Sequence, residues 1–169
     1  MSRPNPQDAA AYYHRYINYV QGNSLQQAMQ NHLHEIKDFY NNLPQEKAAY
    51  AYAEGKWTVK ELLQHVIDTE RIFCYRALCI SRKDTTPLPG FEENDYAATS
   101  NANSRTLQSL KEEFNAVRHS TDCMLASLND DQLSSTGTAS GNSITANAVA
   151  FIILGHLLHH KAILQERYL

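Results

Sequence analysis

The carboxyl-terminal segment constrains the fold most strongly, because it sets three histidines into an apolar run that begins at Phe151. On an α-helix each residue advances by about 100°, so His156 and His160 lie about 40° apart, one turn above the other. Their stripe continues through apolar positions: Val149, Ile152, Ile153, Ile163 and Leu164. A stripe of this kind faces the interior of a helical protein. The segment therefore predicts a buried helix with two imidazoles on its core face.

Buried imidazoles need partners, since an unmet polar group costs about 1 to 3 kcal/mol. A metal ion shared by His156 and His160 would satisfy both. The alternative is a pair of hydrogen-bonded core histidines, but the spacing on an apolar stripe favours ligation. His159 also lies one turn from His156, on the other side, and is the alternate second ligand. We rank it lower because His160 is better centred on the stripe.

A third ligand must come from another helix, and His65 is the best candidate. It lies on the inward side of its segment with Leu62, Val66, Thr69 and Ile72. Helices of a bundle bring inward side chains to a common depth, as bundle metal sites require. Three neutral imidazoles leave one coordination position open, as in catalytic zinc sites. The other histidines lack such pairing and are expected to be ordinary polar residues: His14, His32, His34 and His119.

The clearest helix start in the chain is at Thr58. Thr58 and Glu61 have the spacing of a capping box, and Trp57 and Leu62 flank them as a hydrophobic staple. Apolar positions at helical spacing carry this helix to about Ser81.

The remaining segments also show helical periodicity and no convincing strand alternation. We expect a short helix between Asp8 and Val20, a helix capped by Ser24, one starting near Ser104 and ended by Asn129–Asp131, and a last one capped by Ser143. Residues 82–91 and 134–142 are too rich in helix breakers and are expected to be loops. The fold class is all-α: a four-helix bundle over residues 24–169 and an extension with a short helix over residues 1–23.

Composition narrows the function classes. The 169 residues suit one domain, and a net charge of -3 without dense Lys and Arg runs argues against direct nucleic-acid binding. Three cysteines without CxxC spacing are typical of reduced thiols. No signal peptide is visible at the amino terminus, and no later stretch is expected to span a membrane. These features predict a soluble cytoplasmic protein.

The terminal motif differs from the zinc-protease motif His-Glu-x-x-His, because Leu157 stands where the general base would be. Peptide hydrolysis by that mechanism is therefore disfavoured. A zinc or nickel ion at an open site could activate a water or the thiol of a small cofactor. The nucleophile would then be water or a thiol rather than a side chain.

Several other residues could contribute to a site, but a structural role is expected for each. The charged ones are Asp68, Glu70, Arg71, Arg76, Glu166 and Arg167, which we expect to form solvated ion pairs. An aromatic group, Tyr50, Tyr52 and Trp57, is expected to pack structurally. Gly155 indicates close helix packing, space at the site, or only a tolerated helix glycine.

With these residues in view, two motifs together resemble those of the DinB-like superfamily of metal-binding bundle proteins. One runs from Gly55-Lys56-Trp57-Thr58 through Glu61 to His65 and continues as Asp68-Thr69-Glu70-Arg71; the other is Gly155-His156-Leu157-Leu158-His159-His160 with Glu166-Arg167-Tyr168-Leu169. Pro87-Leu88-Pro89-Gly90-Phe91 also matches. The resemblance covers about residues 24–169.

The resemblance implies an up-down-down-up bundle, a three-histidine site at His65, His156 and His160 that holds nickel or zinc, and a homodimer. It also implies several activities, since the family is similar across thiol-dependent transferases or isomerases, hydrolases, and proteins induced by DNA damage. We expect a metal-dependent enzyme that joins a low-molecular-weight thiol, or water, to an electrophilic small-molecule substrate. The alternatives are a metal-dependent hydrolase, a noncatalytic stress-response bundle, and a metal-free protein whose histidines bond one another.

Overall fold

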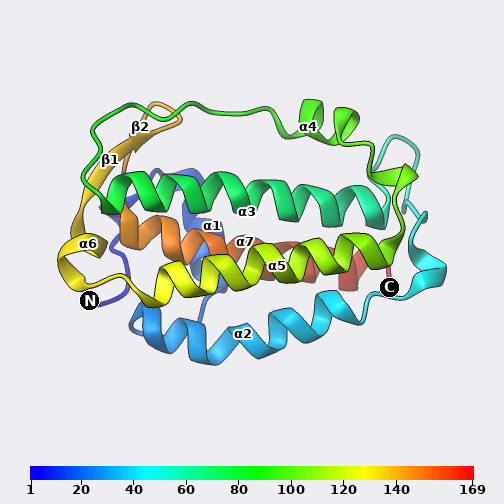
Figure 1. The fold of residues 1–169 in the computed structure, drawn as a ribbon, viewed down its shortest axis with the longest axis horizontal. Helices are drawn as coiled ribbons and strands as arrows, with labels where there is room; N and C mark the ends of the chain where they lie inside the picture. The colour runs from blue at the N-terminus through cyan, green and yellow to red at the C-terminus, as the bar shows by residue number, and fades with distance from the viewer.

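Four long helices form the bundle (Figure 1). The computed structural model describes residues 1–169. The long helices are α2 (Leu25–Asn41), α3 (Val59–Ser81), α5 (Leu107–Ala126) and α7 (Ala146–Arg167). In Figure 1, α2 and α7 run in one direction and α3 and α5 in the other. This is the up-down-down-up order that the resemblance implied, and the predicted all-α bundle is confirmed.

Each long helix begins at a hydroxyl side chain that accepts a hydrogen bond from a backbone N–H three residues on. These caps are Ser24, Thr58, Thr106 and Thr145. Such caps satisfy one of the free N–H groups of the first turn. The caps at Ser24 and Thr58 are confirmed, including the Thr58–Glu61 capping box and the end of α3 at Ser81. The expected caps Ser104 and Ser143 were each two residues early.

Shorter elements connect the long helices. They are η1 (Pro6–Asp8), α1 (Ala11–Tyr19), η2 (Gln45–Lys47), α4 (Glu93–Thr99), η3 (Ala102–Ser104), α6 (Asp130–Ser134), β1 (Thr136–Ala139) and β2 (Asn142–Thr145). The predicted short helix before Val20 is confirmed as α1. Asn129 was expected to end a helix, but α5 already ends at Ala126, and Asn129 instead caps α6 through a capping box with Gln132.

The expectation of no strands was wrong, because residues 136–145 form an antiparallel hairpin. Ser140 and Gly141 both have positive φ, at 51° and 77°, as the turn of a tight two-residue hairpin requires. β1 also pairs at Ala139 with Leu88, so the segment between α3 and α5 is tied to the hairpin. Strands this short have too few residues for alternation to show in the sequence.

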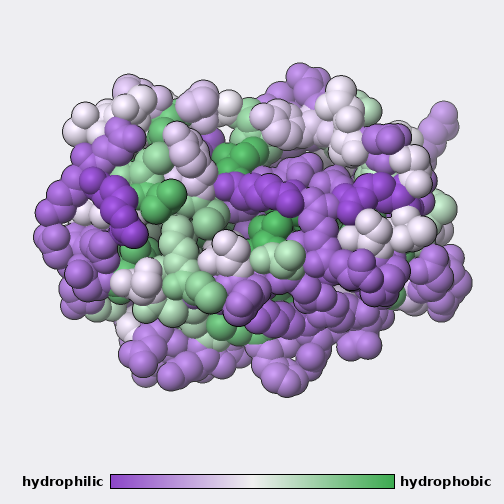
Figure 2. Space-filling model, viewed as in Figure 1, coloured by the Kyte–Doolittle hydropathy of each residue, from purple (hydrophilic) through white to green (hydrophobic).

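The central helix is α7, which packs against α1, α2 and α3. Its length and apolar composition would suffice to cross a membrane, contrary to the expectation that no stretch would do so. Most of the helix is buried inside the bundle, however, as in the core helix of a soluble protein. Figure 2 shows that one face of the molecule is mainly hydrophilic, with apolar side chains gathered in patches toward one end.

Helix α1 lies directly on α7 at Gly155. A Cβ atom added at Gly155 would lie 2.0 Å from the backbone oxygen of Tyr16, so only glycine permits this approach. Of the interpretations given for Gly155, close helix packing is confirmed. The boundary at residues 23 and 24 stays a prediction, but α1 is packed on the bundle rather than separate from it.

Candidate metal centre

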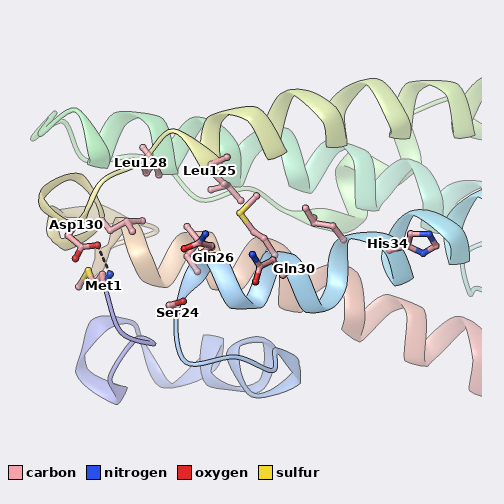
Figure 3. A pocket seen from close by; sticks show the side chains of 13 residues that line it. Met1, Ser24, Gln26, Gln30, His34, Leu125, Leu128 and Asp130 are labelled. Atoms are coloured by element: carbon pink, nitrogen blue, oxygen red, sulfur yellow. Dashed lines mark hydrogen bonds and ion pairs between the residues drawn. The ribbon is translucent and has the colours of Figure 1, made fainter.

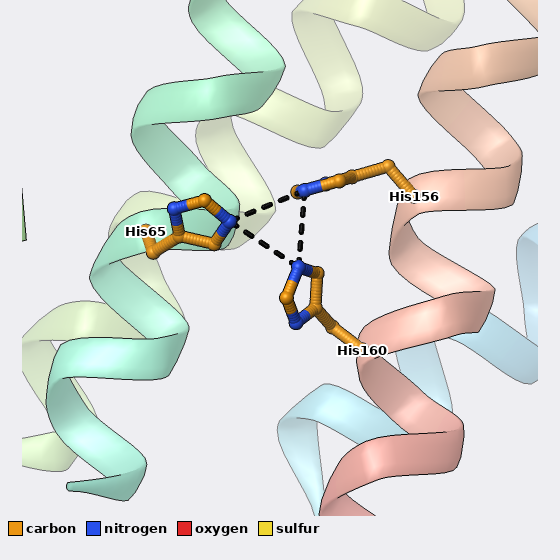
Figure 4. A group of neighbouring side chains, drawn as sticks. All are labelled: His65, His156 and His160. Atoms are coloured by element: carbon orange, nitrogen blue, oxygen red, sulfur yellow. Dashed lines mark hydrogen bonds between the residues drawn. The ribbon is translucent and has the colours of Figure 1, made fainter. Parts of the chain in front are cut away.

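The structure brings His65 of α3 together with His156 and His160 of α7 (Figure 4). The Nε2 atom of His65 lies 3.2 Å from the Nε2 atoms of both His156 and His160, which are 3.1 Å apart. All three residues are buried, with relative exposures of 4 to 8%. The helical spacing that placed His156 and His160 on one stripe therefore leads to three converging nitrogen atoms.

Hydrogen bonding among themselves cannot satisfy these three nitrogens. In neutral imidazole one ring nitrogen is a donor and the other an acceptor, so each Nε2 has a single role. In a closed triangle of three atoms with two roles, at least two share a role and face each other without a bond. A cation removes this conflict, because all three Nε2 atoms then act as lone-pair donors and the protons move to Nδ1.

Electrostatics keep the imidazoles neutral. Burial, with a smaller contribution from His159, lowers the pKa of His65 to about 4. Burial also lowers the pKa of His156 and of His160 well below the ordinary value, and neighbouring histidines add to the shift. Neutral imidazole is the form that binds a metal. The site is therefore ready to bind a cation near neutral pH.

The spacing of the donors also suits a small divalent cation. Zinc–nitrogen bonds of about 2.0 to 2.1 Å in a tetrahedral site place neighbouring donors about 3.3 to 3.4 Å apart. The observed separations of 3.1 and 3.2 Å are within about 0.3 Å of that spacing. The imidazoles thus fit a zinc-sized ion with little rearrangement.

Residues around the triad hold the rings in place. The hydroxyl of Thr69, one turn after His65, lies 3.4 Å from His65 Nδ1. The indole of Trp57 packs on the His65 ring, with centroids 4.8 Å apart, and Phe73 and Tyr16 contact the His156 ring at 5.8 and 5.5 Å. The structural role expected for Trp57 therefore includes the site itself.

Sequence reasoning missed Tyr16 and Phe73 as neighbours of the site. Phe73 follows His65 by eight residues, so helical spacing alone could have placed it on the same face. No sequence signal places Tyr16, because α1 reaches the site only through tertiary packing.

His159 does not join the triad. Its ring is half-buried and stacks edge-on against Tyr16 and Tyr19, at 5.3 and 5.6 Å. Of the histidines expected to be ordinary polar residues, His32 is buried, and its Nε2 accepts a hydrogen bond from the backbone of Gln21 at 2.8 Å. It therefore holds the turn between α1 and α2.

Two residues expected in solvated ion pairs are buried instead. Glu70 is 2% exposed and lies 3.1 Å from Arg118, which is fully buried on α5. Arg76 is 3% exposed and has no carboxylate partner. The expectation was wrong at both positions, because the groups that contact these side chains come from other segments: Arg118 for Glu70, and the Pro89 carbonyl and Ser140 hydroxyl for Arg76. Arg71, by contrast, is half exposed and pairs with Glu113 at 2.6 Å.

A cavity of about 370 Å³ reaches the triad at His156 and also borders Thr69, the neighbour of His65. It lies between α1, α3, the start of α4 and the hairpin. Its other lining residues are Ala10, Tyr12, Tyr13, Tyr16, Phe73, Arg76, Phe91, Glu92, Glu93, Ser140 and Asn142. A small molecule in this cavity would lie against the His156 side of the site.

A larger cavity of about 760 Å³ lies elsewhere, between α2 and α5 (Figure 3). It is lined mainly by apolar side chains, and the amino group of Met1 pairs with Asp130 at its edge. No histidine of the triad borders it. Size alone therefore does not identify the reactive pocket, and the smaller cavity is the better candidate.

Comparisons with known proteins agree with this architecture. YfiT from Bacillus subtilis, described as a probable metal-dependent hydrolase with an unusual four-helix bundle topology, superposes with a TM-score of 0.71 at 14% identity, over 96% of this chain and 89% of that one. A mycothiol-dependent maleylpyruvate isomerase gives a TM-score of 0.64 at 13% identity, over 92% of this chain and 60% of that one. At these identities the likeness shows the fold.

Sequence comparison reaches the same group. A protein of Oceanobacillus iheyensis named as a candidate metal-dependent hydrolase is 24% identical over 84 residues, which is 49% of this chain and 48% of that protein. The chain thus matches about half the length of this relative. The sequence pattern of the DinB superfamily matches residues 28–164, which include His65, His156 and His160. The chain belongs to the DinB superfamily.

Proposed function

We propose that this protein is a metal-dependent enzyme in which His65, His156 and His160 hold one divalent ion, zinc or nickel. The observation that carries the proposal is the triangle of Nε2 atoms at 3.1 and 3.2 Å, whose hydrogen-bonding roles cannot all be met without a cation. Structural zinc sites have four protein ligands, whereas three leave a position for a reactant. Three ligands therefore favour a catalytic site over a structural one.

The chemistry we propose is transfer of a small thiol to an electrophilic substrate. A divalent ion at such a site lowers the pKa of a thiol or water that it binds. The chain's own residues supply three neutral ligands, a cavity leading to His156, and aromatic walls from Phe73 and Tyr16 that limit water around the reacting groups. No other histidine, cysteine or carboxylate group forms a comparable cluster.

A hydrolase is the second candidate function, favoured by the names of the two relatives described as metal-dependent hydrolases. The thiol version has support from the fold neighbour whose name includes mycothiol dependence. The two versions differ in whether an added thiol is consumed. We therefore propose assays of the zinc-loaded and nickel-loaded protein with an aryl halide and cysteine, and with an activated ester without thiol.

The expected result is metal-dependent conjugation of cysteine that is lost in His156→Ala. Ester cleavage without thiol would favour the hydrolase. Stoichiometric metal without either activity would support a noncatalytic metal-binding bundle. We also propose that the protein is a cytoplasmic homodimer whose synthesis is induced by DNA damage; light scattering on the purified protein tests the dimer.

A further inference from the structure

Arg76 is a buried cation without an anion. It lies on α3 with 3% exposure, and no carboxylate oxygen of the protein lies within ion-pair distance of its guanidinium. The other buried arginine of the bundle, Arg118, has two carboxylate partners, at 2.8 and 3.1 Å. A buried charge is costly unless it is paired. The lone guanidinium therefore indicates a partner that comes from outside the chain.

A backbone carbonyl and a side-chain hydroxyl hold Arg76 from one side. Its Nη2 atom donates to the carbonyl oxygen of Pro89 at 2.7 Å and to the hydroxyl of Ser140 at 3.1 Å. The segments that carry these two acceptors are themselves joined by backbone hydrogen bonds. The N–H of Leu88 donates to the carbonyl of Thr138, and the N–H of Ser140 donates to the carbonyl of Leu88. The remaining N–H groups of Arg76 have no protein acceptor. A guanidinium held in this way can present a fixed donor pair to a carboxylate.

Arg76 borders the same cavity as the triad. It follows His65 by eleven residues, about three turns of α3, so the two side chains leave the helix on the same face. The Phe73 ring is close to both Arg76 and His156: its centroid is 5.5 Å from the Arg76 guanidinium carbon and 5.8 Å from the centroid of the His156 ring. The Arg76 guanidinium carbon therefore cannot be farther from the centre of the His156 ring than these two distances added together. A ligand of a few carbon atoms spans that gap.

We propose that Arg76 binds a carboxylate group of the substrate or thiol whose reacting end lies at His156. This inference deepens the proposed function and rests on it for the reacting end. Glu92 and Glu93 border the same cavity, but both are exposed, so solvent and salt screen their charge. They weaken the attraction for an anion at the entrance without pairing with Arg76.

The test compares a carboxylate with its uncharged amide. Hexanoate and hexanamide are titrated into the metal-loaded protein and followed by ligand-observed NMR, which needs no turnover. Charge-assisted hydrogen bonds predict that hexanoate binds about tenfold more tightly, or better. Arg76→Met should abolish that preference, and Arg76→Lys should retain part of it. Arg71→Met is the matched control, since it removes the same charge from the same helix outside this cavity.

Equal binding of the acid and the amide to the unaltered protein would overturn the proposal, as would a preference that survives in Arg76→Met. Thermal unfolding of each variant checks that the Pro89 and hairpin contacts still form. If Arg76→Met does not fold, the acid-to-amide ratio of the unaltered protein and of Arg76→Lys still decides.

A second series separates this inference from the proposed function. The cobalt-substituted protein is titrated with 6-mercaptohexanoate and 6-mercaptohexanamide, and the cobalt absorption reports whether sulfur reaches the ion. If neither thiol changes the spectrum, the thiol function fails while the hexanoate result stands. If both change it with equal affinity, the thiol function stands and the role of Arg76 fails.

Discussion

Helix α3 carries two clusters of buried polar side chains, which differ in whether the chain itself supplies the cations that these groups need. Toward α7, His65 meets His156 and His160, three neutral bases that cannot satisfy one another. Toward α5, Glu70 meets Arg118, which also bonds Asp122 at 2.8 Å, and Asp122 pairs with Lys37 at 2.9 Å. The second cluster balances two carboxylates with two cations from within the chain. The charges of this second cluster therefore balance within the chain, although the Glu70 oxygens and the Arg118 Nη atoms have no hydrogen-bond partner there. The histidine cluster has no cation of its own and therefore indicates a ligand.

The charged cluster should show the largest effect on folding. Arg118→Met would leave Glu70 and Asp122 with fewer cationic partners, and breaking a buried pair costs about 3 to 5 kcal/mol. We expect that loss in the free energy of unfolding, measured by urea denaturation. The double variant Glu70→Leu with Arg118→Met should regain part of it. An Arg118→Met protein as stable as the unaltered chain would contradict the structural role.

The histidine cluster should instead make the metal-free protein sensitive to acid. His65 has a folded-state pKa of about 4, below the ordinary value of 6.5 from which it is shifted. The unfolded chain therefore binds more protons between these values, and stability falls as pH falls through this window. His65 alone accounts for about 3 kcal/mol by pH 4.

Urea denaturation of the metal-free protein at several pH values between 7 and 4 measures this slope. His65→Phe should reduce this slope, and the slope that remains comes from the other buried imidazoles, His156 and His160. A slope that does not depend on His65 would contradict the burial of a neutral imidazole.

The smallest effect is expected at the edge of the histidine cluster. Thr69→Val removes the hydroxyl near His65 Nδ1, a long contact at 3.4 Å. Groups that orient a metal-bound histidine typically contribute about 10- to 100-fold in metal affinity. We expect the lower end, about tenfold, in a competition titration with a zinc chelator. A much larger loss would mean that Thr69 binds the ion directly.

The sequence predicted the histidine cluster because its signal is local. His156 and His160 share a stripe within one turn, and His65 lies on a face marked by a capping box and apolar spacing. The charged cluster carried no such signal, since Glu70 and Arg118 are 48 positions apart and charged residues are exposed by default. The hairpin was missed because its strands have four residues each, too few for alternation to show, and because its bridge to Leu88 forms only in the fold.

Arg76 was only partly predictable from the sequence, unlike the histidine cluster, which was predicted, and the charged cluster, which was not. The sequence placed it among residues that could contribute to a site but predicted a solvated ion pair, because its burial depends on Pro89 and Ser140, which only the fold brings to it. Helical spacing from His65 could have placed it on the same face. The missing carboxylate partner is visible only in three dimensions.

Metal titration of the purified, metal-free protein tests the central claim most directly. We predict that calorimetry will show one zinc or nickel ion bound per chain. The triad itself should release few protons on binding, because its imidazoles are already neutral. The variants His65→Ala, His156→Ala and His160→Ala should each lose at least about 100-fold in metal affinity. His159→Ala should bind like the unaltered protein. Binding of no metal, or equal binding by all four variants, would contradict the account.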